Sequence, residues 1–313
     1  MAVKETTASE TAASETAASE TAVLADALAA PASPTSRLAG ARRRLGWIGM
    51  ACVGVVAAVV LAAVVGQFLV PYDPTVGSVT QRHLGSSAEH LLGTDQAGRD
   101  IFCRLIAGAR TSLLGPLIVV GATAVAGSAL ALTAVWFGGK VDAFLGRVLD
   151  VLFAFPSLLL AILGVAIFGP GLVTASIALA VAYIPYSARV IRSVALRERH
   201  LPYVKAAELQ GINGFTITVR HILPNVWTQI LTGSTINFGY AIVDLAALSF
   251  LGLGIQPPEA DWGLMISNGQ ESLQQGFPEQ SLYAGLCIVV TVAAMAYIGE
   301  RLGGRAAAGR SKR

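Results

Sequence analysis

The chain has 313 residues, of which 54% are hydrophobic and only 13% are charged. This composition excludes an ordinary soluble globular protein, because such a protein could not keep so much apolar surface away from water. The formal net charge of +3 is too small to indicate a nucleic-acid partner. The apolar residues are gathered into long runs, which are typical of segments that cross a lipid bilayer.

The N-terminal residues are polar and repetitive. Residues 6–22 read TTASETAASETAASETA and contain no large apolar side chain. Such a sequence cannot bury enough apolar surface to offset the entropy of ordering it. We therefore predict that residues 1–36 form a disordered tail.

Six stretches are long and apolar enough to cross a bilayer, for which a helix needs about 20 residues. We place them at residues 46–70, 113–137, 151–168, 172–191, 226–253 and 282–298. The third contains Pro156, which a transmembrane helix tolerates when neighbouring groups satisfy the freed carbonyl. The sequence thus predicts an all-α polytopic membrane protein with six transmembrane helices.

The distribution of basic residues orients these helices. Four arginines precede the first span, and short cytosolic segments carry an excess of Lys and Arg. With the N-terminus in the cytosol, the basic loop 192–220 and the basic C-terminus are cytosolic as well. The loop 255–281 is then outside, and it has four acidic residues and no Lys or Arg. We expect both termini on the cytosolic side of a bacterial inner membrane. The segment 71–111 has four arginines and four acids, so its charge does not indicate on which side of the membrane it lies.

The sequence lacks the motifs of catalysis. Gly138-Gly139-Lys140 is followed by Val141 and has no glycine at the upstream position of a phosphate-binding loop. The four histidines show no H-E-x-x-H spacing, and the three cysteines suggest no metal site or disulfide framework. We therefore expect no catalytic residue, no metal site and no cofactor on this chain.

Charged residues within or beside the spans are candidates for function, because a charge in lipid is costly. Asp244 lies in the fifth span, either as a pore-lining or gating carboxylate or as a carboxyl bonded to a neighbouring helix end. Asp150 follows Arg147 by three residues, a helical spacing that favours an ion pair. We retain Asp244, Asp150 and Arg147 as pore or gating candidates.

The segment 196–225, between the fourth and fifth spans, is more organised than a linker needs to be. Pro202 suits the first turn of a short helix, and Gly211 suits its end. Between them, Ala206 and Ala207 are small enough to let another surface approach closely. The segment therefore has the features of an exposed pair of short helices that a partner contacts.

This segment resembles the EAA coupling loop of binding-protein-dependent ABC importers, in which E-A-A, three residues and glycine precede an L-P pair. Here the pattern reads KAAELQG followed by INGFTITVRHILP. Two further stretches are similar to the second permease subunit of dipeptide, oligopeptide and nickel importers, namely LLGTDQAGRDIFCRLIAGARTSL at 91–113 and ALSFLGLGIQPPEADWGLMISNGQ at 247–270. With FAFPSLLLAI at 153–162, the resemblance covers nearly all of residues 47–302.

The resemblance implies the ABC importer permease fold and transport by alternating access. The chain would pair with a homologous sister permease and enclose the path at their interface. Two cytosolic ATPase subunits, which bind ATP and magnesium, would act on the coupling loop, and an extracytoplasmic solute-binding protein would deliver the solute. The coupling residues that it implies are Lys205, Ala206, Ala207, Glu208, Gly211 and Pro224.

Lys205 departs from the family pattern, because this position usually holds the acid of E-A-A. We expect either that Glu208 replaces this acid or that the cognate ATPase carries a compensating acid.

The chain then divides into four parts. These are a disordered cytosolic tail at 1–36, the first transmembrane helix with an external segment at 37–111, a core permease domain with the coupling loop at 112–302, and a basic cytosolic tail at 303–313.

The resemblance favours dipeptides or oligopeptides as cargo and leaves nickel, glutathione and other small solutes open. An ion-coupled secondary carrier, with Asp244 as the coupling group, is the alternative from another class. Such a carrier predicts internal repeat symmetry, which the two halves of the sequence do not show. A membrane scaffold would not need so organised a segment at 196–225. Besides these protein partners we expect membrane lipid and no nucleic acid.

Overall fold

The computed structural model describes residues 34–310, and it describes side chains for residues 47–301 apart from Gln67 and Leu69. Most of the predicted tail, residues 1–33, lies outside the described residues. The chain divides into two compact units, residues 1–47 and 48–313, and the architecture below is that of the second.

Helices make up the regular structure of the described residues, apart from one isolated bridge between Thr94 and Asp100. This confirms the predicted all-α class. The helices are α2 (Pro34–Leu69), η1 (Val79–Gln81), α3 (Ile101–Phe137), α4 (Gly139–Phe153), α5 (Ser157–Phe168), α6 (Leu172–Arg199), α7 (Pro202–Leu209), α8 (Gly214–Ile217), η2 (Thr218–Ile222), α9 (Leu223–Phe250), α10 (Trp262–Asn268), α11 (Gln270–Gln274) and α12 (Glu279–Arg310).

Within residues 34–310, five helices are long and apolar enough to cross a membrane, and a bent pair of helices makes a sixth if it is one span. The five correspond to Trp47–Gly66, Ile101–Phe137, Leu172–Arg199, Gly214–Phe250 and Glu279–Arg301. The bent pair is α4 and α5, which meet at 85°. The prediction of a polytopic membrane protein with up to six spans is therefore confirmed.

The third predicted span, a continuous helix over 151–168, is wrong. Helix α4 starts at Gly139 and ends at Phe153, and α5 begins only at Ser157. Pro156 lies at the break, because its ring removes a backbone donor and disfavours helical geometry at the preceding residue. Hydropathy detected the apolar α5, but it missed that the more polar stretch before residue 151 is helical too.

Helix α3 begins twelve residues before the predicted second span. Asp100 precedes its first residue, and its carboxylate accepts a hydrogen bond of 2.8 Å from the backbone N–H of Cys103. This contact satisfies one of the free donors at a helix start and stabilises a helix typically by about 1 kcal/mol. The second helix of the bundle therefore continues well beyond its most apolar part.

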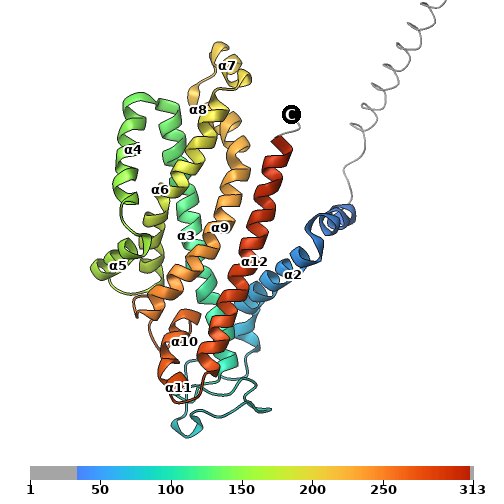
Figure 1. The fold of residues 1–313 in the computed structure, drawn as a ribbon, viewed down its shortest axis with the longest axis vertical. Helices are drawn as coiled ribbons and strands as arrows, with labels where there is room; N and C mark the ends of the chain where they lie inside the picture. Colours follow the sequence, from blue (N-terminus) through green and yellow to red (C-terminus); the bar gives the residue numbers. More distant parts are fainter. Residues whose placement is uncertain (1–33, 311–313) are drawn as a thin grey trace, which may run out of the picture. The chain divides into compact units, whose positions relative to one another are not determined.

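The long helices α3, α6, α9 and α12 lie side by side (Figure 1). Helices α7 and α8 lie at one end of this bundle, and α10 and α11 lie at the other. Helices α3 and α6 approach closely at Gly127, where an added Cβ would lie 3.1 Å from the Ser187 hydroxyl oxygen. Small residues at such crossings are typical of helices packed within membranes.

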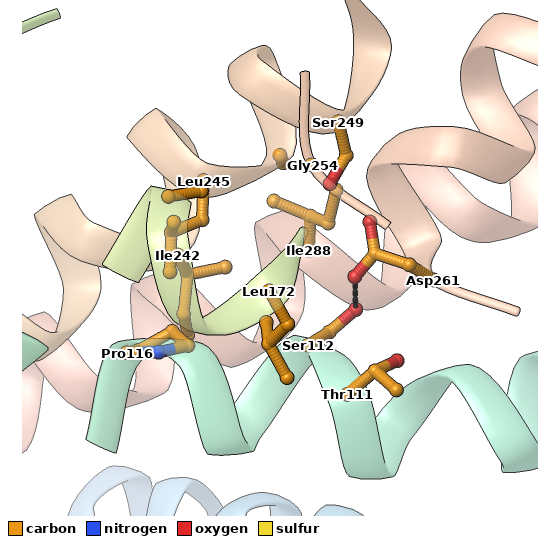
Figure 2. Close-up of a pocket in the computed structure, with 12 residues that line it drawn as sticks. Thr111, Ser112, Pro116, Leu172, Ile242, Leu245, Ser249, Gly254, Asp261 and Ile288 are labelled. Atoms are coloured by element: carbon orange, nitrogen blue, oxygen red, sulfur yellow. Dashed lines mark hydrogen bonds between the residues drawn. The ribbon is translucent and has the colours of Figure 1, made fainter. Parts of the chain in front are cut away.

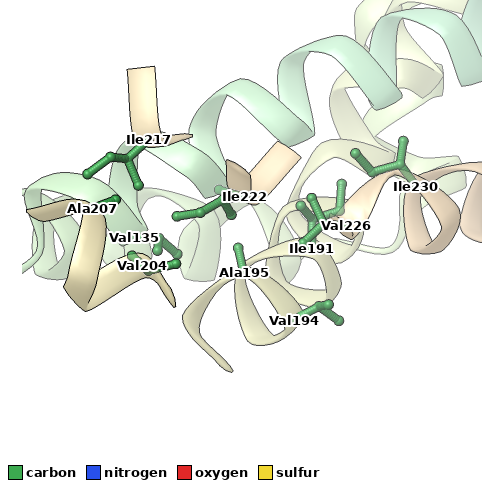
Figure 3. Close-up of a cluster of buried hydrophobic side chains, with 11 residues drawn as sticks. Val135, Ile191, Val194, Ala195, Val204, Ala207, Ile217, Ile222, Val226 and Ile230 are labelled. Carbon is green, nitrogen blue, oxygen red and sulfur yellow. The ribbon is translucent and has the colours of Figure 1, made fainter. Parts of the chain in front are cut away.

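Three apolar clusters follow one another through the unit. At the α7 end, side chains of α3, α6, α7 and α9 meet around Val204 and Ile222 (Figure 3). A second cluster joins α5 to α3, α6 and α9 through Ala161, Val165 and Leu179. A third, around Trp262, joins α10 to α3 and α12. The short helices at both ends are thus packed into the bundle.

Candidate functional site

The predicted short helix in the segment 196–225 is present as α7. Pro202 occupies its first turn, where the missing N–H costs nothing, and the helix ends at Leu209. Gly211 follows in the left-handed region at φ +74°, which a residue without a Cβ adopts at no steric cost. Both helix signals read from the sequence are therefore correct.

Helix α8 is fixed at its start and against α3. The side chain of Asn213 accepts a hydrogen bond of 3.0 Å from the backbone N–H of Phe215. Gly214 lies directly on the Trp136 ring, because a Cβ at this position would fall 1.6 Å from Trp136 Cζ2. The chain then passes through the single π-helical turn Thr218–Ile222 into α9, with Pro224 in the first turn.

The two faces of α7 differ sharply. Val204 and Ala207 are buried in the cluster shown in Figure 3. The other predicted coupling residues are exposed, namely Lys205, Ala206, Glu208, Gly211 and Pro224. Ala207 therefore packs within its own chain and is not free to contact a partner.

Among the exposed large apolar side chains of this segment, Leu209 and Phe215 are by far the most exposed. Leu209 is 90% exposed at the end of α7, and Phe215 is 73% exposed on α8. The sequence analysis did not single them out, although an isolated large apolar residue at each end of a polar turn is a usable signal. We define the coupling surface as Lys205, Ala206, Glu208, Leu209, Gly211 and Phe215.

Hydrogen bonds hold the base of this segment to the bundle. Arg199 donates to the carbonyl oxygens of Val135 and Trp136, the latter at 2.9 Å, and its guanidinium lies 5.1 Å from the centre of the Trp136 ring. The Tyr203 hydroxyl donates to the Glu198 carboxylate at 2.6 Å. Burial and this hydrogen bond raise the pKa of Tyr203 to about 12. These hydrogen bonds therefore fix the end of α6 and the start of α7, which carry the coupling surface.

Asp150 does not form the predicted ion pair with Arg147. Its carboxylate pairs with Arg189 of α6 instead. A second pair joins the same helices, in which Arg192 Nε lies 2.6 Å from Asp142 Oδ1. The ion pairs between α4 and α6 are thus favoured over a pair within α4. In the local Arg147–Asp150 pair the basic residue would precede the acid, an order that interacts less well with the helix dipole. Arg147 lines the charged cleft between α3, α4 and α6, whose volume is about 400 Å³.

Asp244 lies on α9, facing α6 and the start of α5. The Tyr183 hydroxyl donates to Asp244 Oδ2 at 2.9 Å, and Ser157, the first residue of α5, supplies a second hydroxyl. Asp244 as a whole is half-buried rather than fully enclosed. The contact with Ser157 agrees with one of the two expectations for Asp244, a carboxyl bonded to a neighbouring helix end. The other expectation, a pore-lining or gating carboxylate, stays a prediction.

At the opposite end of the bundle, Asp261 connects α10 to α3 (Figure 2). The Ser112 hydroxyl donates to Asp261 Oδ1 at 2.6 Å, and the backbone N–H groups of Gly263 and Leu264 donate to Oδ2. Burial raises the pKa of Asp261 above its ordinary range. The cavity beside it has a volume of only about 10 Å³, which is the smallest size that holds one water molecule. This region is therefore a structural junction, too small for a ligand.

The segment before α3, residues 71–100, is ordered by buried charges. Arg104 is fully buried and donates to the Pro74 carbonyl oxygen at 2.8 Å and to the Pro258 carbonyl oxygen at 3.4 Å. Its Nε lies 3.6 Å from Asp95, which also pairs with Arg99 at 2.8 Å. The sequence analysis did not single out these residues. Their partners lie up to 155 positions away, where one sequence gives no sign of the contact.

Among residues 34–310, no group of three His, Cys, Asp or Glu side chains is placed to hold a metal ion.

Comparisons with known proteins agree on one kind of protein. Residues 123–306 match a family described as "Binding-protein-dependent transport system inner membrane component". The chain is 38% identical over 248 residues to the dipeptide transport system permease protein DppC of Alkalihalophilus pseudofirmus, covering 79% of this chain and 81% of the relative. It is 40% identical over 261 residues to a putative peptide transport system permease protein of Brucella suis, covering 83% and 86%. It is 38% identical over 237 residues to the glutathione transport system permease protein GsiD of Pectobacterium atrosepticum, covering 75% and 78%.

Proposed function

Because the chain belongs to the family of binding-protein-dependent transport system inner membrane components, we propose that it forms half of the path by which an ABC importer takes up dipeptides or oligopeptides. The family resemblance read from the sequence is correct, and the chain is a multi-pass permease subunit of the inner membrane.

Peptide cargo is supported by the names of the relatives. Those from Alkalihalophilus pseudofirmus and Brucella suis are named for dipeptide and peptide transport. Glutathione is the second candidate, because the relative from Pectobacterium atrosepticum has the same identity of 38% and is named for glutathione transport. Both cargoes are small peptides with a free amino group and carboxylates.

The single observation that carries the coupling role is the exposure of Leu209 and Phe215 on an otherwise anchored segment. Isolated apolar side chains are common on surfaces, but here two of them occur within ten residues of the small exposed Ala206 and Gly211. We propose that cytosolic ATPase subunits dock on this coupling surface. Orientation follows from this role, with α7, α8 and both termini in the cytosol and α10 and α11 outside.

The anchoring of α7 supports transmission of motion. Val204 and Ala207 pack against α3 and α6, and the segment enters α9 through the turn that contains Pro224. A push on the coupling surface would therefore move the ends of several long helices together, as a rigid lever requires. ATP and magnesium would act at the ATPase subunits, and a sister permease would complete the path.

Lys205 and Glu208 line the same cleft beside α7, and both are exposed. Glu208 thus presents an acid three residues after the position where the family usually has one. We propose that Lys205 meets an acidic residue of the cognate ATPase, while Glu208 supplies the negative charge of the loop.

Uptake of labelled dialanine into proteoliposomes that contain this chain, its sister permease, its ATPases and loaded binding protein tests the proposal. We expect uptake that requires ATP and is inhibited by excess dipeptide more strongly than by glutathione. Stronger inhibition by glutathione would favour the second candidate, and uptake by this chain without ATPases would contradict the proposal.

A further inference from the structure

The break between α4 and α5 exposes irregular backbone. The two helices meet at 85°, and residues 153–156 are all exposed. Pro156 precedes α5 and makes no side-chain cap, so α5 begins with free N–H donors. Irregular backbone at membrane depth is stable only where protein buries it or where it lines a water-filled cavity. Hydrocarbon therefore cannot cover this break.

Asp244, which is half-buried, lies at the same place. Ser157, which supplies a hydroxyl to Asp244, is the first residue after the break. Tyr240, one helical turn before Asp244 on α9, is 63% exposed. An ionised carboxylate that faces lipid costs several kcal/mol, so this face also requires water or another protein.

The exposed break before α5 and the half-buried acid Asp244 beside it thus mark one face of the chain as a wall of the translocation path. Asp244 lies six residues before the end of α9, which corresponds to about 9 Å along the helix. In the proposed orientation this is the outer part of the path, which a solute reaches soon after it leaves the binding protein.

We propose that Asp244, assisted by the hydroxyls of Tyr183 and Tyr240, binds the protonated amino terminus of the peptide as it enters the path. A carboxylate has about four acceptor positions, and Tyr183 and Ser157 occupy only two of them. An ammonium group offers three donors and forms charge-assisted hydrogen bonds with such a carboxylate. This inference rests on the proposed peptide import and adds the part of the peptide that the permease recognises.

The test compares uptake of dialanine and N-acetyl-dialanine by the complete reconstituted complex, in the wild type and in Asp244→Asn. The binding protein is the same in both complexes, so a changed ratio between the two peptides reports on the permease. We expect Asp244→Asn to reduce dialanine uptake about tenfold, as loss of one charge-assisted hydrogen bond predicts, and to leave the slow uptake of the acetylated peptide unchanged. Asp244→Glu should keep most of the uptake, and the control Glu300→Gln, at an exposed acid of α12 with no role in the path, should keep the wild-type ratio.

An unchanged ratio in Asp244→Asn would overturn the inference. If this variant does not assemble, Tyr240→Phe serves instead, because it removes only an exposed hydroxyl; an unchanged ratio there would overturn the inference equally. A wild-type complex that takes up no dialanine would contradict the proposed function itself. Uptake of both peptides at equal rates by the wild type would contradict only the amino-terminal site.

Discussion

Val204 and Leu209 lie five residues apart on the short helix α7, yet Val204 is fully buried and Leu209 is 90% exposed. One side chain holds the helix to the bundle, and the other is available to a partner. This separation allows anchoring and docking to be tested independently.

Leu209→Ala should leave the thermal stability of the permease unchanged and weaken its association with the ATPase subunits. Val204→Ala, in contrast, should lower the stability of the permease by about 1–3 kcal/mol, because it leaves a cavity in a buried apolar cluster. Thermal unfolding in detergent and co-purification of the ATPases measure the two effects. Equal loss of stability in both variants would contradict the division of α7 into two faces.

Gly214→Ala should displace α8, because the new Cβ would overlap the Trp136 ring. We expect reduced ATPase co-purification despite a mutation outside the coupling surface. Trp136→Leu in the same chain should restore part of the association by making room for the methyl group. The displacement mechanism fails if the double variant is no better than Gly214→Ala alone.

Ser112→Ala should loosen the junction between α3 and α10, because the Asp261 carboxylate loses a short hydrogen bond. The cost should be about 1.5–3 kcal/mol, as for other hydrogen bonds to charged groups. Faster proteolysis of the loop 251–261 would show that the junction has loosened. Ser193→Ala is the matched control, since that exposed hydroxyl bonds only to a carbonyl of its own helix, and it should leave the proteolysis rate unchanged.

Lys205→Glu restores the acid that the family usually has at this position, and we expect it to weaken association with the cognate ATPase. The reason is repulsion between the new carboxylate and the proposed acid of the partner. Competition pull-down against the wild-type permease measures the loss of association. High salt should make the difference between the two permeases smaller, because it screens the repulsion. Unchanged association would contradict the compensation hypothesis.

Local patterns in the sequence were sufficient for much of this structure. Apolar runs located the long helices, and Pro202 and Gly211 marked the start and end of α7, because these signals depend on neighbouring residues alone. The family resemblance also rested on continuous motifs, among them the one at 205–224.

Features that depend on tertiary contacts could not be predicted in the same way. Pairing of Asp150 with Arg189 and burial of Ala207 follow from how α4 and α7 pack on α6. Pro156 was noted in the sequence but interpreted as tolerated within one continuous span, so the 85° break between α4 and α5 was not predicted. The Asp95–Arg104 cluster likewise gave no pattern in the sequence.

The most direct test of the central claim is ATP hydrolysis by the complete complex in proteoliposomes, measured with and without peptide-loaded binding protein. We predict that loaded binding protein stimulates hydrolysis and that Leu209→Asp on the coupling surface abolishes this stimulation. Val79→Asp, at a position that is 70% exposed at the opposite end of the bundle from α7, should not detach the ATPases. Stimulation that persists in Leu209→Asp, or peptide transport by this chain without ATPases, would contradict the account.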